Sequence, residues 1–363
     1  MSAAAKERLD LLIAKARVDL YKPIQIAEVL RAARLKQAKI DFANLESYRN
    51  PSIAWRNAVT KRLLNKHSTS SARYQHDVWN DNAMPAAILK ELDKANQESA
   101  GVVERYIYAK FAERQNLVSK LLTTIQAATP TDFQLSELLS YFESEKTVRR
   151  SVDKVYEIVT HALFETVVRA LKATVTVAVP AESRDLLNEF QDLASVLLGL
   201  SGGVLEKTVD AHIYRVGVTN AADRGLDMWA NFGPAVQVKH LSLSEELASE
   251  IVDQVESDHI VIVCRSVDAV AIRAITKQIS WGRRIRGIVT EKHLGEWYEK
   301  CLRGKYGPDL GPELLRNLEL DFQEEFPQTK EIAGFMTERG YDKLSKLGIW
   351  TTDADKAIKS HRR

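Results

Sequence analysis

The sequence predicts a mixed α/β protein, in which a helical N-terminal region is followed by a mixed sheet flanked by helices. Up to about residue 172, apolar residues recur at helical spacing. Short β-branched segments bounded by turn residues begin near residue 173. From residue 183 the expected order is helix, three strands, helix, strand, helix, strand. That order is typical of a sheet that combines an antiparallel meander with a crossover.

The helical region is expected to span residues 1–172. Apolar residues from Leu9 to Leu20 mark one face of a first helix. Long helices are expected at 102–127 and 148–171, because their apolar residues form continuous stripes at helical spacing. The region is therefore predicted to fold as a helical unit.

The second region, residues 173–291, is predicted to form the α/β core. Its connectors contain glycine, proline and asparagine, which favour turns. Residues 292–363 are expected to be a helical C-terminal extension. The segments predicted for the core are a strand at 173–179, a helix at 183–199, strands at 212–218, 225–230 and 235–240, a helix at 244–256, a strand at 259–264, a helix at 267–279 and a strand at 285–290.

Composition excludes several classes of protein. With 363 residues, 45% of them hydrophobic, the chain can bury the cores of roughly two domains. Its two cysteines, Cys264 and Cys301, cannot form a disulfide framework, which favours a reducing cytoplasm. No segment is long and apolar enough to cross a membrane, and the first residues do not resemble a secretory leader. We therefore expect a cytoplasmic protein without a membrane partner.

Charge is distributed unevenly along the chain. Residues 1–80 contain 15 Lys and Arg against 7 Asp and Glu, whereas the remainder contains 36 against 42. A basic front part beside an acidic remainder favours a region that binds a polyanion such as nucleic acid. A solvated helical surface is the alternative interpretation of the same pattern.

Three polar residues on two neighbouring predicted strands form the candidate catalytic site. Asp227 lies in an otherwise apolar strand, and Gln237 and Lys239 alternate with valines on the next strand. A turn at 231–234 would bring the three side chains together. Carboxylate and amide oxygens are ligands for Mg²⁺, and a lysine beside them can position or deprotonate a water. The set therefore suits hydrolysis of a phosphodiester bond.

Other catalytic signatures are absent from the sequence. There is no phosphate-binding Gly-x-x-x-x-Gly-Lys-Ser/Thr motif, no Cys/His spacing for zinc and no dinucleotide fingerprint. ATP-driven translocation by this chain is therefore not expected.

Asp227, Gln237, Val238 and Lys239 resemble the signature of the PD-(D/E)XK nuclease superfamily. Leu226 stands where the usual proline would be, and Gln237 replaces the usual acid, which is a known variant of this fold. The resemblance implies Mg²⁺ held at Asp227, Gln237 and Val238, with Lys239 as the catalytic lysine.

Longer segments are similar to the HaeII-type family of type II restriction endonucleases. These segments run from Tyr214 to His240, from Tyr48 to Asn57 and from 68 to 75. The similarity extends from about residue 8 to about residue 330. It implies Mg²⁺-dependent cleavage of double-stranded DNA at a short palindromic site related to RGCGCY. A homodimer would suit such a site, and a cognate DNA methyltransferase would belong to the same system.

An additional carboxylate is expected from outside the motif. Glu189, on the helix before the three strands, is the candidate for a fourth catalytic residue. Asp223, in the loop between the predicted strands 212–218 and 225–230, is the alternative. A solvated helix position is the other interpretation of Glu189.

A basic and aromatic segment between residues 49 and 75 is the candidate DNA-binding region. Its side chains have the donor chemistry of phosphate clamps and base-edge contacts. The alternative is a basic amphipathic helix followed by a serine-rich loop. The candidates are Arg49, Trp55, Arg56, Lys61, Arg62, Lys66, Ser70, Arg73, Tyr74 and Gln75.

Two other functions remain open from the sequence. A modification-dependent or repair nuclease could carry the same glutamine variant. A non-catalytic DNA-binding regulator could be built on an inactive nuclease fold, although such decay is expected to lose Asp227 or Lys239, and both are present.

Overall fold

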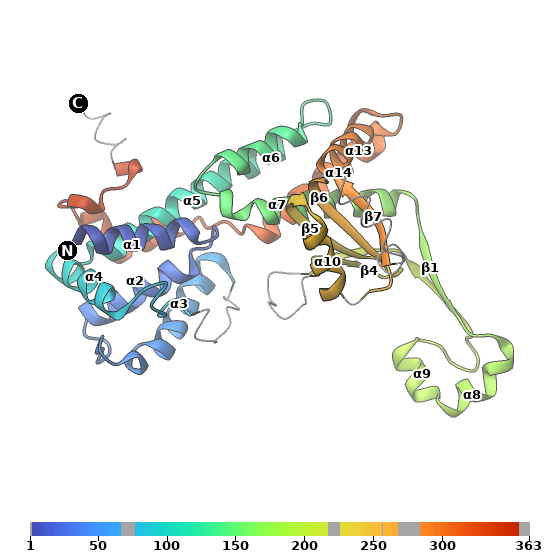
Figure 1. Ribbon diagram of the computed structural model, residues 1–363, viewed down its shortest axis with the longest axis horizontal. Helices are drawn as coiled ribbons and strands as arrows, with labels where there is room; N and C mark the ends of the chain where they lie inside the picture. The colour runs from blue at the N-terminus through green and yellow to red at the C-terminus, as the bar shows by residue number, and fades with distance from the viewer. Residues whose placement is uncertain (1, 67–76, 217–225, 256, 268–283, 356–363) are drawn as a thin grey trace.

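The computed structural model describes residues 2–66, 77–216, 226–255, 257–267 and 284–355. The described chain forms a helical lobe, a lobe built on a sheet, and an arm that extends from the sheet lobe (Figure 1). The mixed α/β class expected from the sequence is confirmed.

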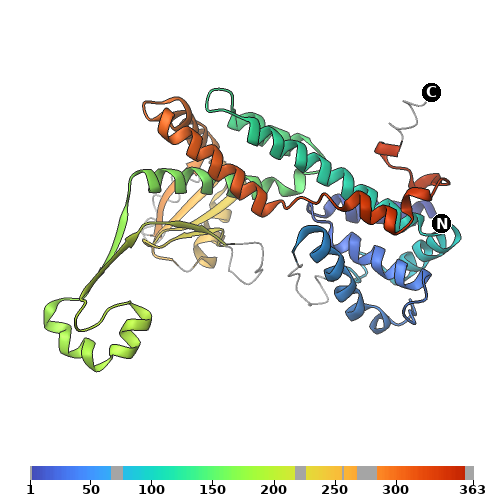
Figure 2. The ribbon, with the colours of Figure 1, turned by 180° about the vertical axis from the view of Figure 1, so that it is seen from behind.

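The helical lobe combines the N-terminal helices with the C-terminal end of the chain. Its buried core includes residues from Ala5 to Phe111 together with Phe335, Tyr341 and Trp350. The chain returns to this lobe after crossing back from the sheet lobe (Figure 2). Its helices are α1 (Ser2–Lys15), α2 (Tyr21–Arg34), α3 (Arg49–Leu64), α4 (Ala86–Glu98), the first half of α5 (Val102–Ala127) and α15 (Ile332–Glu338).

Helix α5 connects the two lobes. Ile107 and Phe111 in its first half belong to the helical core, whereas Val118 and Leu122 in its second half belong to the core of the sheet lobe. One continuous helix therefore contributes side chains to both cores.

The sheet lobe contains five strands in the order β3-β4-β5-β6-β7. Strand β4 pairs antiparallel with both β3 and β5. Strands β5, β6 and β7 run parallel to one another. This is the predicted meander followed by a crossover. The strands are β3 (Ile213–Arg215), β4 (Met228–Ala230), β5 (Ala235–Leu243), β6 (Ile260–Val267) and β7 (Ile285–Thr290).

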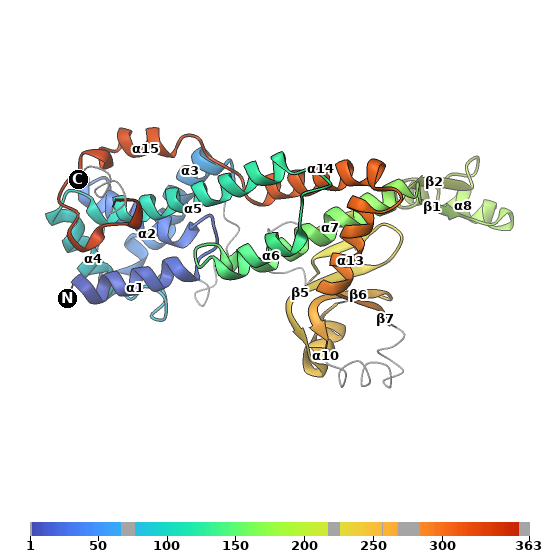
Figure 3. The ribbon, with the colours of Figure 1, turned by 90° about the horizontal axis from the view of Figure 1, so that it is seen from above.

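Helices cover both faces of this sheet, as Figure 3 shows. Val236 and Val238 pack into a large core with helices that precede and follow the five strands in the sequence. Ala235 and Leu243 belong to a smaller core with α10. Alternate residues of β5 therefore serve the two faces. The helices of the large core are α6 (Leu135–Ser144), α7 (Val152–Ala170), α13 (Glu291–Arg303) and α14 (Gly307–Glu325), and α10 is Glu245–Gln254.

The predicted three-part division does not coincide with these hydrophobic cores. Helices α6 and α7, assigned from the sequence to residues 1–172, pack on the sheet, as do α13 and α14 from the expected extension 292–363. Of the described residues in the expected extension 292–363, only the part from Ile332 onward contributes to the core of the helical lobe. Contacts between elements distant in sequence decide the grouping, and local periodicity does not record them.

The arm, residues 174–210, departs from the sequence prediction. Its strands β1 (Thr174–Ala178) and β2 (Glu206–Asp210) pair only with each other among the described strands, so the strand expected at 173–179 is not part of the core sheet. The helix expected at 183–199 is two short helices, α8 (Arg184–Glu189) and α9 (Gln191–Leu197). Phe190 lies between them with a non-helical backbone.

Two further expectations concern the cysteines and the membrane. Cys264 and Cys301, which were not expected to form a disulfide framework, are both free, and both are buried. Within the described residues, no helix combines the length and apolarity needed to cross a membrane.

Glu104 on α5 is the buried ionic centre of the helical lobe. Its carboxylate accepts hydrogen bonds from Arg34 Nε at 2.8 Å, Asn96 Nδ2 at 2.6 Å and Tyr341 Oη at 2.6 Å. These partners come from α2, α4 and the C-terminal segment. One carboxylate therefore joins three parts of the lobe to α5.

We expect Glu104→Ala to lower the free energy of unfolding by about 3–5 kcal/mol, because it leaves the Arg34 guanidinium without its partner in a largely buried site. Thermal and urea unfolding measure the change. Glu98→Ala, at an exposed position of α4, is the matched control and should unfold like the parent. An unchanged midpoint for Glu104→Ala would contradict this role.

Candidate active site

Asp227 lies between β3 and β5 at the residue before β4 begins. Its backbone nitrogen donates to Val236 O at 3.3 Å, and its carbonyl accepts from Val216 N at 2.9 Å. Its side-chain Oδ2 accepts from Gln237 Nε2 at 2.7 Å and from Val238 N at 2.8 Å. The hairpin expected from the 231–234 turn therefore brings Asp227 and Gln237 together.

Gln237 has a buried side-chain oxygen that accepts no hydrogen bond from the described residues. The residue is 3% exposed, and its amide nitrogen is held by Asp227. Within the described part of the chain, Gln237 Oε1 has no hydrogen-bond partner. A buried acceptor without a donor is costly, so this atom is suited to a ligand.

Lys239 follows on the same strand and acts electrostatically on Asp227. Burial raises the pKa of the Asp227 carboxyl, whereas the Val238 amide, Lys154 and Lys239 lower it. Lys239 is half-buried, and it has no hydrogen bond or ion pair among the described residues. Its ammonium group is therefore available near the carboxylate.

Helix α7 adds a carboxylate that the sequence analysis missed. Glu157 is 4% exposed, and both of its oxygens accept from Lys154 Nζ, at 2.8 and 2.7 Å. Burial raises the pKa of Glu157 to about 7, with Lys154 opposing and Asp227 adding to the rise. Glu157 and Lys154 thus belong to the same electrostatic site as Asp227.

A weak signal for Glu157 was present in the sequence. The residue interrupts the apolar run from Val155 to Val159, and a buried acid in such a run requires a partner. Its sequence separation from Asp227 hid the relation, because only the packing of α7 on β5 brings the two together.

Of the two carboxylates proposed from the sequence, Glu189 is not at this site. Glu189 is exposed at the end of α8, in the arm and away from the sheet strands (Figure 1). It therefore supplies no carboxylate beside Asp227, whereas Glu157 interacts electrostatically with Asp227. Asp223 lies outside the described residues.

Several DNA-binding candidates are engaged inside the helical lobe. Arg56 is 3% exposed and donates to Gln25 Oε1 at 3.0 Å, so it is a structural residue. Arg49 Nε donates to Asp77 Oδ2 at 2.7 Å. Trp55 is partly buried against the helical core. The prediction of DNA contact therefore fails for Arg56, because folding removes its guanidinium from the surface.

The next three candidates lie at the end of α3. Arg62 pairs with Glu331 at 3.5 Å and with Glu338 at 2.7 Å, and Lys66 donates to backbone carbonyls near the end of α14. Lys61 is exposed without a partner among the described residues. The remaining candidates, Ser70, Arg73, Tyr74 and Gln75, lie outside the described residues.

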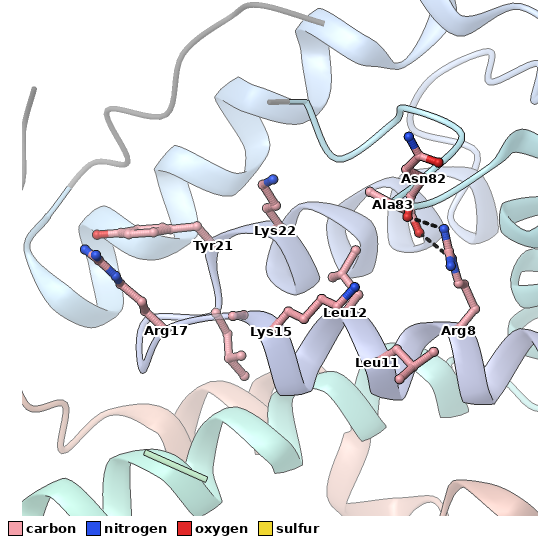
Figure 4. A pocket seen from close by; sticks show the side chains of 11 residues that line it. Arg8, Leu11, Leu12, Lys15, Arg17, Tyr21, Lys22, Asn82 and Ala83 are labelled. Carbon is pink, nitrogen blue, oxygen red and sulfur yellow. Dashed lines mark hydrogen bonds between the residues drawn. The ribbon is translucent and has the colours of Figure 1, made fainter. Parts of the chain in front are cut away.

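A basic pocket between α1 and α2 was not anticipated. Its volume is about 330 Å³, and Figure 4 shows Arg8, Lys15 and Lys22 among its lining side chains. Arg17, which also lines it, pairs with Asp153 Oδ2 at 2.9 Å. Asp153 belongs to α7 and precedes Lys154, so a residue that lines this pocket contacts the helix that carries Glu157.

The strand order and the site define a class of protein. An antiparallel meander followed by parallel strands, with an acid at the second strand and Gln-x-Lys on the third, is the arrangement of PD-(D/E)XK nucleases.

Comparison with known proteins gives the family. The HaeII restriction endonuclease family matches residues 5–341. The chain is 47% identical to the type II restriction enzyme HaeII of Haemophilus aegyptius over 341 residues, 93% of this chain and 97% of that protein. It is 46% identical to the type II restriction enzyme NgoBI of Neisseria gonorrhoeae over 342 residues, 93% and 96% of the two chains. No solved structure matches.

The chain belongs to the HaeII restriction endonuclease family, which makes it a type II restriction endonuclease. Enzymes of this type generally depend on a divalent metal ion. Among the described residues, no group of three or more His, Cys, Asp and Glu side chains is arranged to hold one.

We expect Glu157→Gln to weaken divalent-cation binding by about 10–100-fold, because a charged oxygen ligand or its close support is lost. Calorimetric titration with Mn²⁺ measures the affinity without requiring cleavage. The change also leaves Lys154 buried and unpaired, at a cost of about 3–5 kcal/mol of stability.

The double variant Lys154→Met/Glu157→Gln separates these two effects. It should regain much of the stability, since no unpaired charge remains, while cation binding stays weak. Parental Mn²⁺ affinity in Glu157→Gln would show that Glu157 is only structural.

Proposed function

We propose that the enzyme hydrolyses both strands of double-stranded DNA at a short palindromic site, with Mg²⁺ held at Asp227, Gln237 and Val238. The observation that carries the proposal is the Asp227 carboxylate, fixed through Oδ2 by Gln237 and Val238, while Gln237 Oε1 is buried without a donor among the described residues. This orientation leaves an acidic and an amide oxygen for a cation.

The donor set fits Mg²⁺. Carboxylate, amide and backbone carbonyl oxygens are hard ligands, and Mg²⁺ commonly takes one or two carboxylates while keeping several waters. Asp227 Oδ1 has no hydrogen bond among the described residues. Gln237 adds no charge, so Glu157 is the source of a second negative charge.

A bound Mg²⁺ supplies positive charge to the pentacovalent phosphate and acidifies water at the site. Lys239 holds the attacking water by hydrogen bonding and offsets negative charge as the phosphate is attacked. Asp227 and Gln237 orient the reacting groups, because their side chains are fixed to each other. Lys154 balances Glu157, which keeps two acids tolerable in one buried site.

The helical lobe supplies the DNA-binding surface in this proposal. Lys15 and Lys22 line a basic pocket beside α7, and Lys61 is exposed on α3. Cations in this arrangement neutralise successive phosphates and set the register of the duplex over the site.

The resemblance to HaeII-type enzymes supports a recognition site related to RGCGCY. A palindrome is read and cut most simply by a two-fold homodimer. A cognate methyltransferase that protects the same site and a cytoplasmic location complete the proposal. A modification-dependent nuclease and an inactive regulator are less favoured, because the relatives are restriction enzymes and Asp227 and Lys239 are retained.

The active-site assignment predicts different outcomes for two similar changes. Gln237→Glu should remain a metal-dependent nuclease with tighter cation binding, since it keeps an oxygen and adds a charge. Asp227→Asn should lose both cation binding and cleavage, because an amide replaces the carboxylate that Gln237 and Val238 orient. Mg²⁺ titration of the cleavage rate and Mn²⁺ calorimetry measure both effects.

Lys239→Ala is the control for that experiment. It should stop cleavage but keep Mn²⁺ binding, since its ammonium group is not a metal ligand. The assignment fails if Asp227→Asn cuts DNA like the parent, or if the parent cuts equally well in excess EDTA.

The DNA-binding surface is tested by salt dependence. Lys15→Ala/Lys22→Ala should lower affinity and reduce the slope of log K against log salt concentration by about 2, one unit for each phosphate contact. Fluorescence anisotropy in Ca²⁺ measures binding without cleavage. Lys90→Ala/Lys94→Ala, two exposed lysines of α4, is the matched control, and an equal effect of both pairs would contradict the assignment.

A further inference from the structure

The arm has little internal support. Its two strands form a sheet of their own, and nearly every residue of both strands is exposed. An isolated two-stranded sheet is marginally stable in water. The figures show the arm extending from the sheet lobe away from the helical lobe (Figures 1 and 3). Another surface is needed to stabilise this conformation.

The end of the arm exposes an apolar face. Its buried cluster consists of Leu187, Ala194 and Leu200. Larger apolar side chains remain in solvent, including Val196 at 88% and Leu197 at 73% exposure. The six main side chains of this arm face are Leu186, Phe190, Leu193, Val196, Leu197 and Val204.

Exposed apolar side chains of the arm face come from both short helices. Leu186 lies on α8, Leu193 and Leu197 lie four residues apart on α9, and Phe190 lies at the break between the two helices. The buried cluster of the arm does not include these side chains. The arm's own core therefore leaves a second set of apolar side chains uncovered.

The charge pattern argues against a nucleic-acid partner. No charged residue occurs from 193 to 205, so this part of the face cannot neutralise phosphates. Residues 193–205 also lack like charges that would repel an identical segment, whereas Asp185, Glu189 and Asp192 flank the Leu186 and Phe190 part of the face. A self-complementary apolar contact is therefore the best match.

We propose that the arm face packs against the same face of a second copy of the chain and forms the dimer interface. The proposal rests on the homodimer in the proposed function and identifies its contact surface. Six exposed side chains of about 100 Å² each give about 600 Å² per chain. Two copies bury about 1,200 Å², which reaches the range of stable interfaces. A two-fold contact uses the same patch on both subunits, in keeping with a palindromic target.

Sedimentation velocity of the full-length protein tests this proposal. The parent should sediment as a dimer at micromolar concentration, and Leu193→Glu/Leu197→Glu should sediment as a monomer with an unchanged unfolding temperature. Leu320→Glu changes an exposed leucine of α14 outside the arm and should remain a dimer. The apparent dissociation constant of the arm variant should rise by at least a hundredfold.

A second variant guards against misfolding of the altered arm. Replacing residues 179–205 by Asn-Gly closes the hairpin between Ala178 and Glu206 with a two-residue turn. This variant lacks the whole arm face and should also be monomeric, with concentration-dependent cutting of the second DNA strand.

The outcomes distinguish the interface from the proposed function. If both arm variants remain dimers, the arm interface is wrong, although a dimeric nuclease stands. If the parent is a monomer, the arm interface and the homodimer are both wrong, while metal-dependent cleavage is judged separately. A monomeric parent whose DNA affinity falls in the arm variants would assign the face to DNA and overturn the proposal.

Discussion

The structure depends on partners for two buried carboxylates, Asp227 and Glu157, where α7 packs near β4 and β5. Asp227 receives Gln237 Nε2 and Val238 N on one carboxylate oxygen, and Glu157 receives Lys154 on both of its oxygens. Buried carboxylates are tolerated only when paired or hydrogen-bonded. The site therefore requires the β4–β5 register and the position of α7 at the same time. A one-residue slip of β5 would turn Gln237 to the other face of the sheet and leave Asp227 without this amide.

Helix α7 is held in place by the part of the chain that follows the sheet. His161 Nδ1 lies 2.7 Å from Asp321 Oδ2 on α14, and Tyr298 on α13 donates to Val159 O at 2.9 Å. Arg215 on β3 pairs with Glu325 of α14 at 2.7 Å. These contacts explain why α13 and α14 belong to the nuclease core. They also mean that Glu157 is positioned by residues more than a hundred positions away in the chain.

Local sequence patterns predicted the strands and the hairpin because their signals are local. Alternation in 235–240 and the turn at 231–234 suffice to bring Gln237 beside Asp227. Glu157 was missed because it joins the site through the packing of a helix on a sheet, which no local period records. The helix at 148–171 was predicted from its apolar stripe, whereas the place of Glu157 beside Asp227 was not. The separate pairing of β1 with β2 was missed for the same reason. It joins residues far apart in the sequence, such as Thr176 and Thr208, and no local pattern records such a pair.

The basic charge of the first 80 residues predicts a region that binds a polyanion, but it is an imprecise guide to individual side chains. Arg34 and Arg56 are engaged within the helical lobe, so their charges stabilise the fold. Arg17 pairs instead with Asp153 on α7, next to Lys154. This contact joins the basic pocket to the helix that carries Glu157. A phosphate that drew Arg17 away from Asp153 would leave an acid near Asp227 without its cation, and a divalent metal ion would add to the positive charge that Lys154 and Lys239 already supply there. DNA binding and metal binding are therefore expected to favour each other at this helix.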